Sequence, residues 1–258
     1  MHFVGVDLAW GGRKPTGLAV LDDEGRLAHL SSAVGDRAII QALRPYVDGD
    51  VLVAVDAPLV VANATGNRPA EAALGRDFAR FDAGAHPVNT GRPGFEESPR
   101  GARLAASLGL EIGGDSSRRA VEVYPHPATI ALFRLPRVLR YKQKPGRSLE
   151  QLRSELLRLV DLVAGLSSAT PPLHVAGCAE WATVAATVAG AARKSELRPA
   201  EDEVDAVICA YVALVATRAP ERVTTYGDPT TGEIVTPTLP LGHRPGPRRP
   251  DASGPDAS

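Results

Sequence analysis

Short apolar runs between turn-forming residues dominate the first part of the chain. Residues 3–8, 16–21 and 27–30 are apolar runs of strand length, and the polar segment 22–26 predicts a hairpin turn between the last two. Residues 51–55 are apolar throughout, which is typical of a strand buried on both faces. An opening hairpin, followed by a helical crossover to a buried strand, predicts a mixed sheet with at least one parallel pair.

Helical patterns dominate the second half of the chain, and apolar residues recur at helical spacing over residues 148–164. We expect helices at about 36–46, 69–82, 129–133, 148–164, 178–193 and 202–218, and further strands at 119–124, 223–226 and 233–236. These elements predict a single α/β domain over residues 1–241, with an irregular Gly-, Pro- and Asn-rich insertion at about 62–101. Pro, Gly, Arg and Ser dominate residues 242–258, which predicts a disordered tail.

Composition and charge argue against several classes of protein but do not indicate a particular activity. The 258 residues carry a net charge of −1, so no global basic field favours nonspecific nucleic-acid binding. Cys178 and Cys209 lie far apart in the chain and match no zinc-binding spacing. No apolar run reaches the roughly 20 residues that span a bilayer, and the first strand follows without a signal sequence. We therefore expect a cytoplasmic protein with no membrane partner, whose oligomeric state the sequence leaves open.

Two acidic residues stand at the ends of strand-like runs. Asp7 lies at the end of the first run, and Asp56 directly follows the run 51–55, where Pro58 stops the strand. If the two strands are neighbours, both carboxylates meet at one edge of the sheet. Nearby carboxylates repel each other unless a cation lies between them, and Mg²⁺ prefers such oxygen ligands. The alternative is that each carboxylate separately accepts hydrogen bonds from loop amides.

A second acidic pair opens the last expected helix. Asp202 and Asp205 are three residues apart and therefore share one helix face. Acidic residues in the first turn are also favoured by the helix dipole, so capping alone would explain both. The almost wholly apolar stretch after Asp205 predicts that the helix packs into the core, with its first turn against the sheet edge.

Glu122 and His126 are further candidates with plain alternatives. Glu122 interrupts an apolar strand, and simple alternation would let it face solvent. His126 lies between two prolines, where an imidazole could act as an acid, a base or a ligand, although a loop histidine is more often none of these.

Four motifs occur in the order found in a known superfamily. They are residues 5–10 (GVDLAW), 55–59 (VDAPL), 122–127 (EVYPHP) and 202–206 (DEVDA). With these motifs the chain resembles the ribonuclease H-like superfamily and, more closely, the domain-of-unknown-function family 429, whose members are predicted nucleases of that fold. The resemblance extends over nearly the whole chain apart from the tail.

The resemblance implies an α/β fold with a mixed five-stranded sheet flanked by helices. It places Asp7 on the central strand, Asp56 on the adjacent parallel strand and Asp205 on the final helix. The glutamate that ribonuclease H carries in its first helix has no match within residues 36–46. Glu122 is the residue that could take its place in space.

The activity implied by the resemblance is metal-dependent hydrolysis of phosphodiester bonds, with two Mg²⁺ or Mn²⁺ ions about 4 Å apart at the scissile phosphate. Asp7 would bridge the two ions, while Asp56 and Asp205 would each complete one site. Asp202 is a further expected ligand, and its three-residue spacing from Asp205 resembles that of Holliday-junction resolvases. Glu122 is the fourth expected catalytic acid.

Basic residues supply the expected contacts to a phosphate-bearing substrate. They lie in the segment 136–147, in the insertion and beside the expected strand 119–124, and they are Lys142, Lys144, Arg147, Arg68, Arg92 and His126. The alternative for the basic segment is a solvated loop. Aromatic residues make up only 5% of the chain, so stacking platforms for single strands look sparse. A structured nucleic acid or a small phosphorylated molecule is therefore the expected substrate.

Two other functions stay open. An ATP-binding phosphotransferase of the actin and sugar-kinase type would cradle phosphate with Asp7 and the turn before Thr16 and Gly17, but such proteins normally have two domains of this kind. A non-catalytic nucleic-acid or nucleotide-binding module would keep the fold and lose the chemistry. The presence of Asp7, Asp56 and Asp205 argues against that loss.

Overall fold

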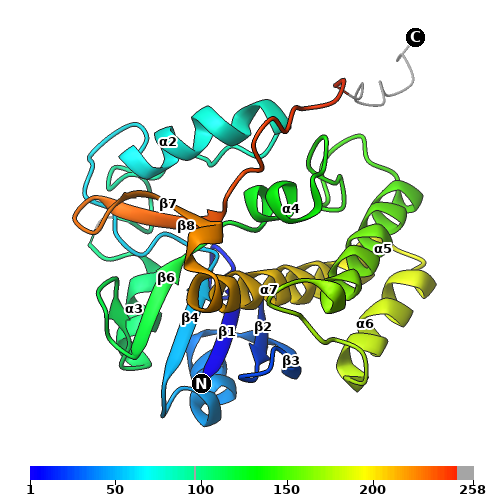
Figure 1. Ribbon diagram of the computed structural model, residues 1–258, viewed down its shortest axis with the longest axis horizontal. Coiled ribbons are helices and arrows are strands. Elements are labelled where there is room, and N and C mark those ends of the chain that lie inside the picture. Colours follow the sequence, from blue (N-terminus) through cyan, green and yellow to red (C-terminus); the bar gives the residue numbers. More distant parts are fainter. Residues whose placement is uncertain (96, 249–258) are drawn as a thin grey trace.

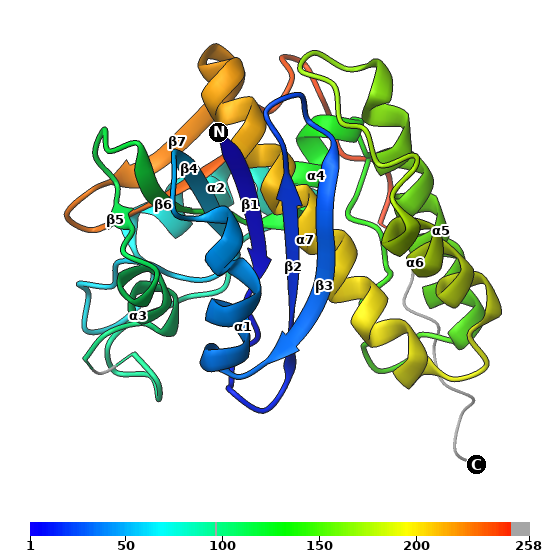
Figure 2. The same cartoon turned by 90° about the horizontal axis from the view of Figure 1, so that it is seen from below.

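The computed structural model describes residues 1–95 and 97–248 (Figure 1). Its largest sheet has six strands in the order β3-β2-β1-β4-β6-β5 (Figure 2). The antiparallel pairs are β1 with β2 and β2 with β3, whereas β1, β4, β6 and β5 run parallel. The strands are β1 His2–Asp7, β2 Pro15–Leu21, β3 Leu27–Val34, β4 Val51–Val55, β5 Glu111–Ile112 and β6 Arg118–Glu122. Because β1, β4 and β6 are parallel, their carboxyl ends lie at one edge of the sheet.

Helices cover both faces of this sheet. They are α1 Asp36–Leu43, α2 Pro69–Phe78, α3 Arg100–Ser107, α4 Pro125–Phe133, α5 Leu149–Gly165, α6 Ala179–Gly190 and α7 Lys194–Arg218. Helix α7 crosses one face with α5 and α6 beside it, and α1 and α3 cover the other face (Figures 1 and 2). A separate hairpin of β7 Val223–Asp228 and β8 Gly232–Pro237 packs on α2. None of the described helices combines the length and the apolar character that a membrane crossing requires.

Alternation along the strands divides the apolar core between the two faces. In β1, Phe3 belongs to the cluster that includes α7, whereas Val4 and Val6 belong to the cluster that includes α1 and α3. In β4, Leu52 and Ala54 lie on the α7 side in the same way. Side chains an even number of positions further along either strand therefore also point toward α7.

Helix α7 lies directly against the sheet because two glycines face it. A Cβ atom on Gly5 would lie 1.9 Å from the carbonyl oxygen of Ala206, and one on Gly17 would lie 1.9 Å from the carbonyl oxygen of Asp202. Both distances are far below a normal contact, so no residue other than glycine allows this approach of backbone to backbone. The two contacts fix which part of α7 meets β1 and β2.

Helix α7 begins earlier than the sequence pattern predicts. It starts at Lys194 and contains Pro199, a residue type that usually marks the end of a helix or its first turn. Asp202 and Asp205 consequently lie beyond the first two turns. The expectation that they occupy the first turn is wrong, and the dipole of the helix terminus does not explain them.

Three smaller differences concern the middle of the chain. The two-residue strand β5 pairs with β6, so the sheet has six strands and the expectation of five is wrong. The pattern did not predict helix α3 either, and α4 starts at Pro125 because proline is well tolerated at the first position of a helix. The other expected strands and helices are confirmed to within a few residues.

The described part of the tail lies on the body of the protein. The ring of His243 stacks on Phe81 with centroids 5.0 Å apart, and the N–H of Gly246 donates to the carbonyl oxygen of Pro136. Composition predicts disorder from residue 242 onward, whereas residues 242–246 make these contacts. The rest of that prediction, over residues 249–258, falls outside the described residues.

Replacing Gly17 by alanine tests the contact between α7 and the sheet. The added methyl group would force α7 away from β2, so we expect Gly17→Ala to lower the free energy of unfolding by about 3 kcal/mol or more. Urea denaturation followed by circular dichroism measures this change. Gly75→Ala is the matched control, because that helical glycine has no atom within 4 Å of an added Cβ and alanine should stabilise it by up to ~1 kcal/mol. Equal stability of the two variants would contradict the inference.

Candidate functional site

Four carboxylates from three elements converge where β1 and β4 end. Asp7 is the last residue of β1 and Asp56 follows β4, and alternation directs both side chains toward α7. Helix α7 brings Asp202 and Asp205 to the same place, because the backbone of Asp202 lies against Gly17, the partner of Asp7 in β2. The structure thus brings together the four acids that the sequence marks as metal ligands.

Lys142 lies among these carboxylates. Its Nζ atom is 2.5 Å from Oδ2 of Asp205 and 3.9 Å from Oδ2 of Asp7. The hydroxyl group of Tyr141 donates to Oδ1 of Asp205 at 2.7 Å. Burial alone would lower the pKa of Lys142, but the charges of Asp205 and Asp7 outweigh it and raise the pKa well above its usual value. Lys142 is therefore a charged partner for part of the acid cluster.

Several carboxylate oxygens of the cluster accept no hydrogen bond. Oδ2 of Asp7 and Oδ2 of Asp202 are buried without a hydrogen-bond partner among the described residues, and so is Oε1 of Glu201, the acid that precedes Asp202 on α7. The other oxygen of Asp202 accepts a bond from Nε of Arg198 at 3.3 Å. Buried carboxylate oxygens are costly unless a cation, a donor or water satisfies them. A further positive charge beside these oxygens would therefore stabilise the cluster.

Burial raises the pKa of these acids, and the neighbouring charges modulate the rise. Desolvation raises the pKa of Asp7 well above its usual value, with Lys142 opposing and Asp205 adding to the rise. It raises the pKa of Asp56 and of Glu201 to about 7, and that of Asp202 to about 6. At neutral pH the cluster accordingly carries less than its full negative charge.

A cavity of about 320 Å³ opens onto the cluster. Asp7, Asp56 and Asp202 lie in its wall, whereas Asp205 is fully buried. The same wall contains Arg68 and six further basic or imidazole side chains, which are Lys14, His86, His126, Lys142, Lys144 and Arg198. The cavity therefore combines carboxylates, which suit a metal ion, with cations, which suit a phosphate.

His126 lies in the cavity wall between two aromatic rings. Its ring centroid is 5.5 Å from that of Tyr124 and 6.0 Å from that of Tyr141. Burial, followed by the charges of Lys142 and Lys144, keeps the pKa of His126 well below its usual value. The imidazole is neutral at pH 7 and is able to donate or accept a hydrogen bond without adding charge.

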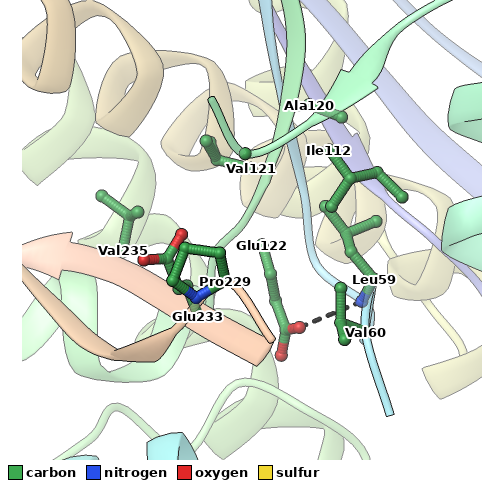
Figure 3. A pocket seen from close by; sticks show the side chains of 10 residues that line it. Leu59, Val60, Ile112, Ala120, Val121, Glu122, Pro229, Glu233 and Val235 are labelled. Atoms are coloured by element: carbon green, nitrogen blue, oxygen red, sulfur yellow. Dashed lines mark hydrogen bonds between the residues drawn. The ribbon is translucent and has the colours of Figure 1, made fainter. Parts of the chain in front are cut away.

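Arg68 and Glu122, which also line the cavity, form a buried ion pair. The two terminal nitrogens of Arg68 donate to both carboxylate oxygens of Glu122, at 2.8 and 2.5 Å. Nε of Arg68 donates to Glu71 at 2.9 Å, and the N–H of Leu59 also donates to Glu122 (Figure 3). Arg68 is only 1% exposed. Neither the expected phosphate contact of Arg68 nor the expected catalytic role of Glu122 fits this arrangement, because both side chains are buried and already engaged in hydrogen bonds within the protein.

The same network ties the insertion to the sheet. Glu71 accepts hydrogen bonds from the N–H groups of Arg68 and Val88, and Arg68 donates to the carbonyl oxygen of Val60. Since Glu122 ends β6, these bonds connect both flanks of α2 to the main sheet. The network thereby holds this part of the insertion, including His86, in the cavity wall.

Two of the expected substrate contacts lie elsewhere. Arg92 donates to the carbonyl oxygen of Pro87, and Arg147 donates to that of Lys142 at 2.7 Å. Neither side chain belongs to the described wall of the cavity. The side chain of Arg147 therefore holds the backbone of Lys142 and does not line the cavity.

Sequence reasoning missed several side chains of the cavity or the cluster, namely Trp10, Lys14, His86, Tyr124, Tyr141 and Arg198. Tyr141 had a signal in the sequence, since it directly precedes Lys142. Arg198 lies four residues before Asp202 on the same helix, and it was hidden because the helix was expected to start later. Trp10 and Tyr124 lie within the motifs 5–10 and 122–127, which mark a site without giving these two side chains a role. Lys14 and His86 have no signal that a single sequence would show.

The donor set suits a hard divalent cation, although no preformed site is present. Carboxylate oxygens are the ligands that Mg²⁺ and Mn²⁺ prefer, and Oδ2 of Asp7 and Oδ2 of Asp202 have no hydrogen-bond partner among the described residues. Within the described part of the chain, no three His, Cys, Asp or Glu side chains are placed to hold a metal ion. Lys142 instead holds positive charge beside Asp205 and Asp7. A divalent cation would therefore compete with Lys142 for these carboxylates.

Comparison with known proteins places the chain in a family and no further. A family model described as "Protein of unknown function (DUF429)" matches residues 5–231. No curated protein and no solved structure matches the chain. The matched range contains all four acids of the cluster together with Lys142.

Replacing Asp56 by asparagine tests the raised pKa of this carboxyl. Its pKa rises from 3.8 to about 7 on folding, so the folded state loses stability as pH rises through this interval and Asp56 ionises. Asparagine cannot ionise. We therefore expect Asp56→Asn, in a chelating buffer, to be more stable than the native chain by roughly 2–4 kcal/mol near pH 8 and to lose that advantage near pH 4.

Chemical denaturation of both proteins over this pH range measures the difference. Asp48→Asn is the control, because Asp48 is an exposed acid in the loop before β4 and its replacement should leave the pH profile unchanged. A difference between Asp56→Asn and the native chain that does not vary with pH would refute the raised pKa.

Proposed function

The chain belongs to the DUF429 family, and we propose that it is a divalent-cation-dependent hydrolase of phosphodiester bonds, a nuclease of the ribonuclease H-like superfamily. One observation carries the proposal: four carboxylates from β1, the end of β4 and α7 gather beside a cavity whose wall also holds lysines. Acids alone would suit a cation site and lysines alone an anion site. Both together suit a phosphate that is bound through a metal ion.

The strand arrangement supports the superfamily assignment. The sheet continues from the antiparallel strands β3, β2 and β1 into the parallel strands β4 and β6. Asp7 ends the strand at which the antiparallel part meets the parallel part, Asp56 follows the adjacent parallel strand, and Asp205 lies on the last long helix. The short strand β5 is an addition at the edge of this pattern.

The acids of the cluster would hold Mg²⁺ or Mn²⁺ through the oxygens of Asp7, Asp56, Asp202 and Asp205. Such an ion, when bound, supplies a coordinated water of lowered pKa and positive charge opposite the phosphate. Tyr141 keeps Asp205 oriented through its hydrogen bond to Oδ1. The proposed substrate is a nucleic acid or another phosphodiester, because the lysines of the wall offer contacts to phosphate oxygens.

Lys142 has two roles in this proposal. Without a divalent cation it compensates the charge of Asp205 and Asp7, and its side chain is 30% exposed, so it has access to the cavity. Once a cation takes over the carboxylates, the ammonium group is available for a phosphate oxygen. His126 in the same wall is neutral and can hydrogen-bond to the substrate or to a water without adding charge.

A second candidate function is a non-catalytic nucleic-acid or nucleotide-binding module. The observation that favours it is the ion pair between Lys142 and Asp205, which already neutralises part of the acid cluster. If that pair were permanent, the site would bind phosphate through its lysines and have no use for a metal ion. The two experiments below separate these candidates.

Asp7→Asn tests the hydrolytic activity. We expect the native chain to cleave at least one of labelled single- or double-stranded DNA, RNA or a small chromogenic phosphodiester when Mg²⁺ or Mn²⁺ is present. Asp7→Asn removes a central carboxylate and should lower this rate by at least ~100-fold, whereas Asp48→Asn should leave it unchanged. Undiminished cleavage by Asp7→Asn would show that the activity arises elsewhere, and binding without cleavage under all conditions would favour the second candidate.

Lys142→Met tests the competition between the lysine and a divalent cation. In a chelating buffer the variant should be less stable than the native chain, because Asp205 and Asp7 lose their partner. Added Mn²⁺ should then raise its melting temperature more than that of the native chain, by roughly 2–4 °C for each kcal/mol of added binding free energy.

Thermal unfolding with and without Mn²⁺ measures both effects. Lys144→Met is the matched control, since it removes the same charge from the same cavity wall but forms no ion pair with a described residue. If Mn²⁺ shifts all three proteins equally, Lys142 does not compete for a cation site. If it shifts none of them, the acids bind no such ion.

A further inference from the structure

We propose that Trp10, beside the cavity of the acid cluster, is a stacking surface for a nucleobase of the substrate. The inference rests on the proposed function and narrows its substrate class. The substrate would be a nucleotide or a nucleic acid with an unpaired base next to the phosphate that enters the cavity. Its test does not depend on hydrolysis.

Trp10 is an unusual surface residue in this protein. It is 71% exposed, and it is the only aromatic residue among the exposed large apolar side chains of the described residues. An exposed apolar side chain by itself needs no explanation, because much of any protein surface is apolar. The place of Trp10 and the way its loop is held carry the argument.

Trp10 lies between two hollows of the surface. Its side chain lines the cavity that also contains Asp7 and Lys14, and it lines a second, smaller hollow of about 60 Å³ together with Pro58 and Phe95. The ring of Phe95 meets that of Trp10 at 76° with the centroids 5.7 Å apart, which is a favourable edge-to-face contact. The small hollow cannot enclose a nucleobase, so a base would lie on the open surface of the Trp10 ring.

The loop that carries Trp10 is held by hydrogen bonds to both backbone groups of the preceding residue, Ala9. The N–H of Ala9 donates to the buried hydroxyl group of Thr16 at 3.2 Å, and the carbonyl oxygen of Ala9 accepts from Arg100. Arg100 also forms an ion pair with Asp36 at 2.6 Å, which fixes the guanidinium group. A side chain presented from such an ordered backbone loses little conformational entropy when a ligand stacks on it.

A nucleotide matches the two neighbouring surfaces with one molecule. Its phosphate would meet the cavity that contains Asp7 and Lys14, and its planar base would meet Trp10, only three residues further along the chain. Stacking on an aromatic ring tolerates every base, because each base has a π-face. The low aromatic content of the chain is no obstacle, since one well-placed ring next to the phosphate site is enough.

Fluorescence of Trp10 provides the test. The chain has two tryptophans, and Trp181→Phe leaves Trp10 as the only one. This protein is titrated, with Ca²⁺ in place of Mg²⁺, with a short single-stranded oligothymidylate and with an abasic strand of the same length and charge. We expect the base-containing strand to quench Trp10 fluorescence and to bind roughly tenfold more tightly than the abasic strand, which should not quench.

Trp10→Ala should abolish the preference for the base-containing strand, as measured by anisotropy of labelled strands, while affinity for the abasic strand stays unchanged. Trp10→Phe should retain part of the preference. Ile112→Ala, which trims an exposed apolar residue of β5, is the control and should change neither affinity. Because Trp10 and Ile112 are exposed, we expect their variants to stay folded, and circular dichroism shows whether Trp181→Phe, at a buried residue, keeps the native fold.

Equal binding of the two strands by the native chain, absence of binding of both, or a preference that survives in Trp10→Ala would overturn the proposal. A failure of the proposed function has a different signature. Quenching by bases without any hydrolysis would uphold the stacking surface and argue against the nuclease. Hydrolysis that depends on Asp7, with equal binding of the two strands, would support the nuclease and argue against the stacking surface.

Discussion

The close contact between helix α7 and the sheet is the constraint on which the rest of this structure depends. Gly5 and Gly17 let the backbone of α7 approach β1 and β2 to a distance that any side chain would prevent. The contact fixes both the height and the rotation of the helix. It thereby places Asp202 and Asp205 beside the carboxylate of Asp7. A helix packed at the usual distance, with side chains between it and the sheet, would not bring these acids together.

Bringing the acids together creates an electrostatic problem that the protein solves only in part. Lys142 compensates Asp205 and Asp7, yet oxygens of Asp7, Asp202 and Glu201 accept no hydrogen bond among the described residues, and burial raises the pKa of each of these three acids. Such an arrangement costs folding free energy. Natural proteins tolerate this kind of cost mainly where function requires it. The cluster differs in this respect from an ordinary set of buried ion pairs.

The network around Arg68 is the contrasting case in the same cavity wall. There Glu122 and Glu71 are both saturated by the guanidinium group and by backbone N–H groups. It connects the insertion to β6 and engages all three nitrogens of the Arg68 guanidinium group. One part of the cavity wall is thus held by saturated ion pairs, while another part carries incompletely paired charges and the exposed ring of Trp10. This division explains which charged residues of the cavity are candidates for chemistry and which hold the site in shape.

The sequence by itself determined most of the strands and helices and the candidate acids Asp7 and Asp56, because strand periodicity and a proline stop are local signals. Only the tertiary structure decided the rest. Pro199 concealed the true start of α7, so the environment of Asp202 could not be inferred from a helix terminus. The pairing of Glu122 with Arg68 joins residues 54 positions apart. Contacts of this range depend on which surfaces meet when the chain folds, and no local pattern of one sequence records them.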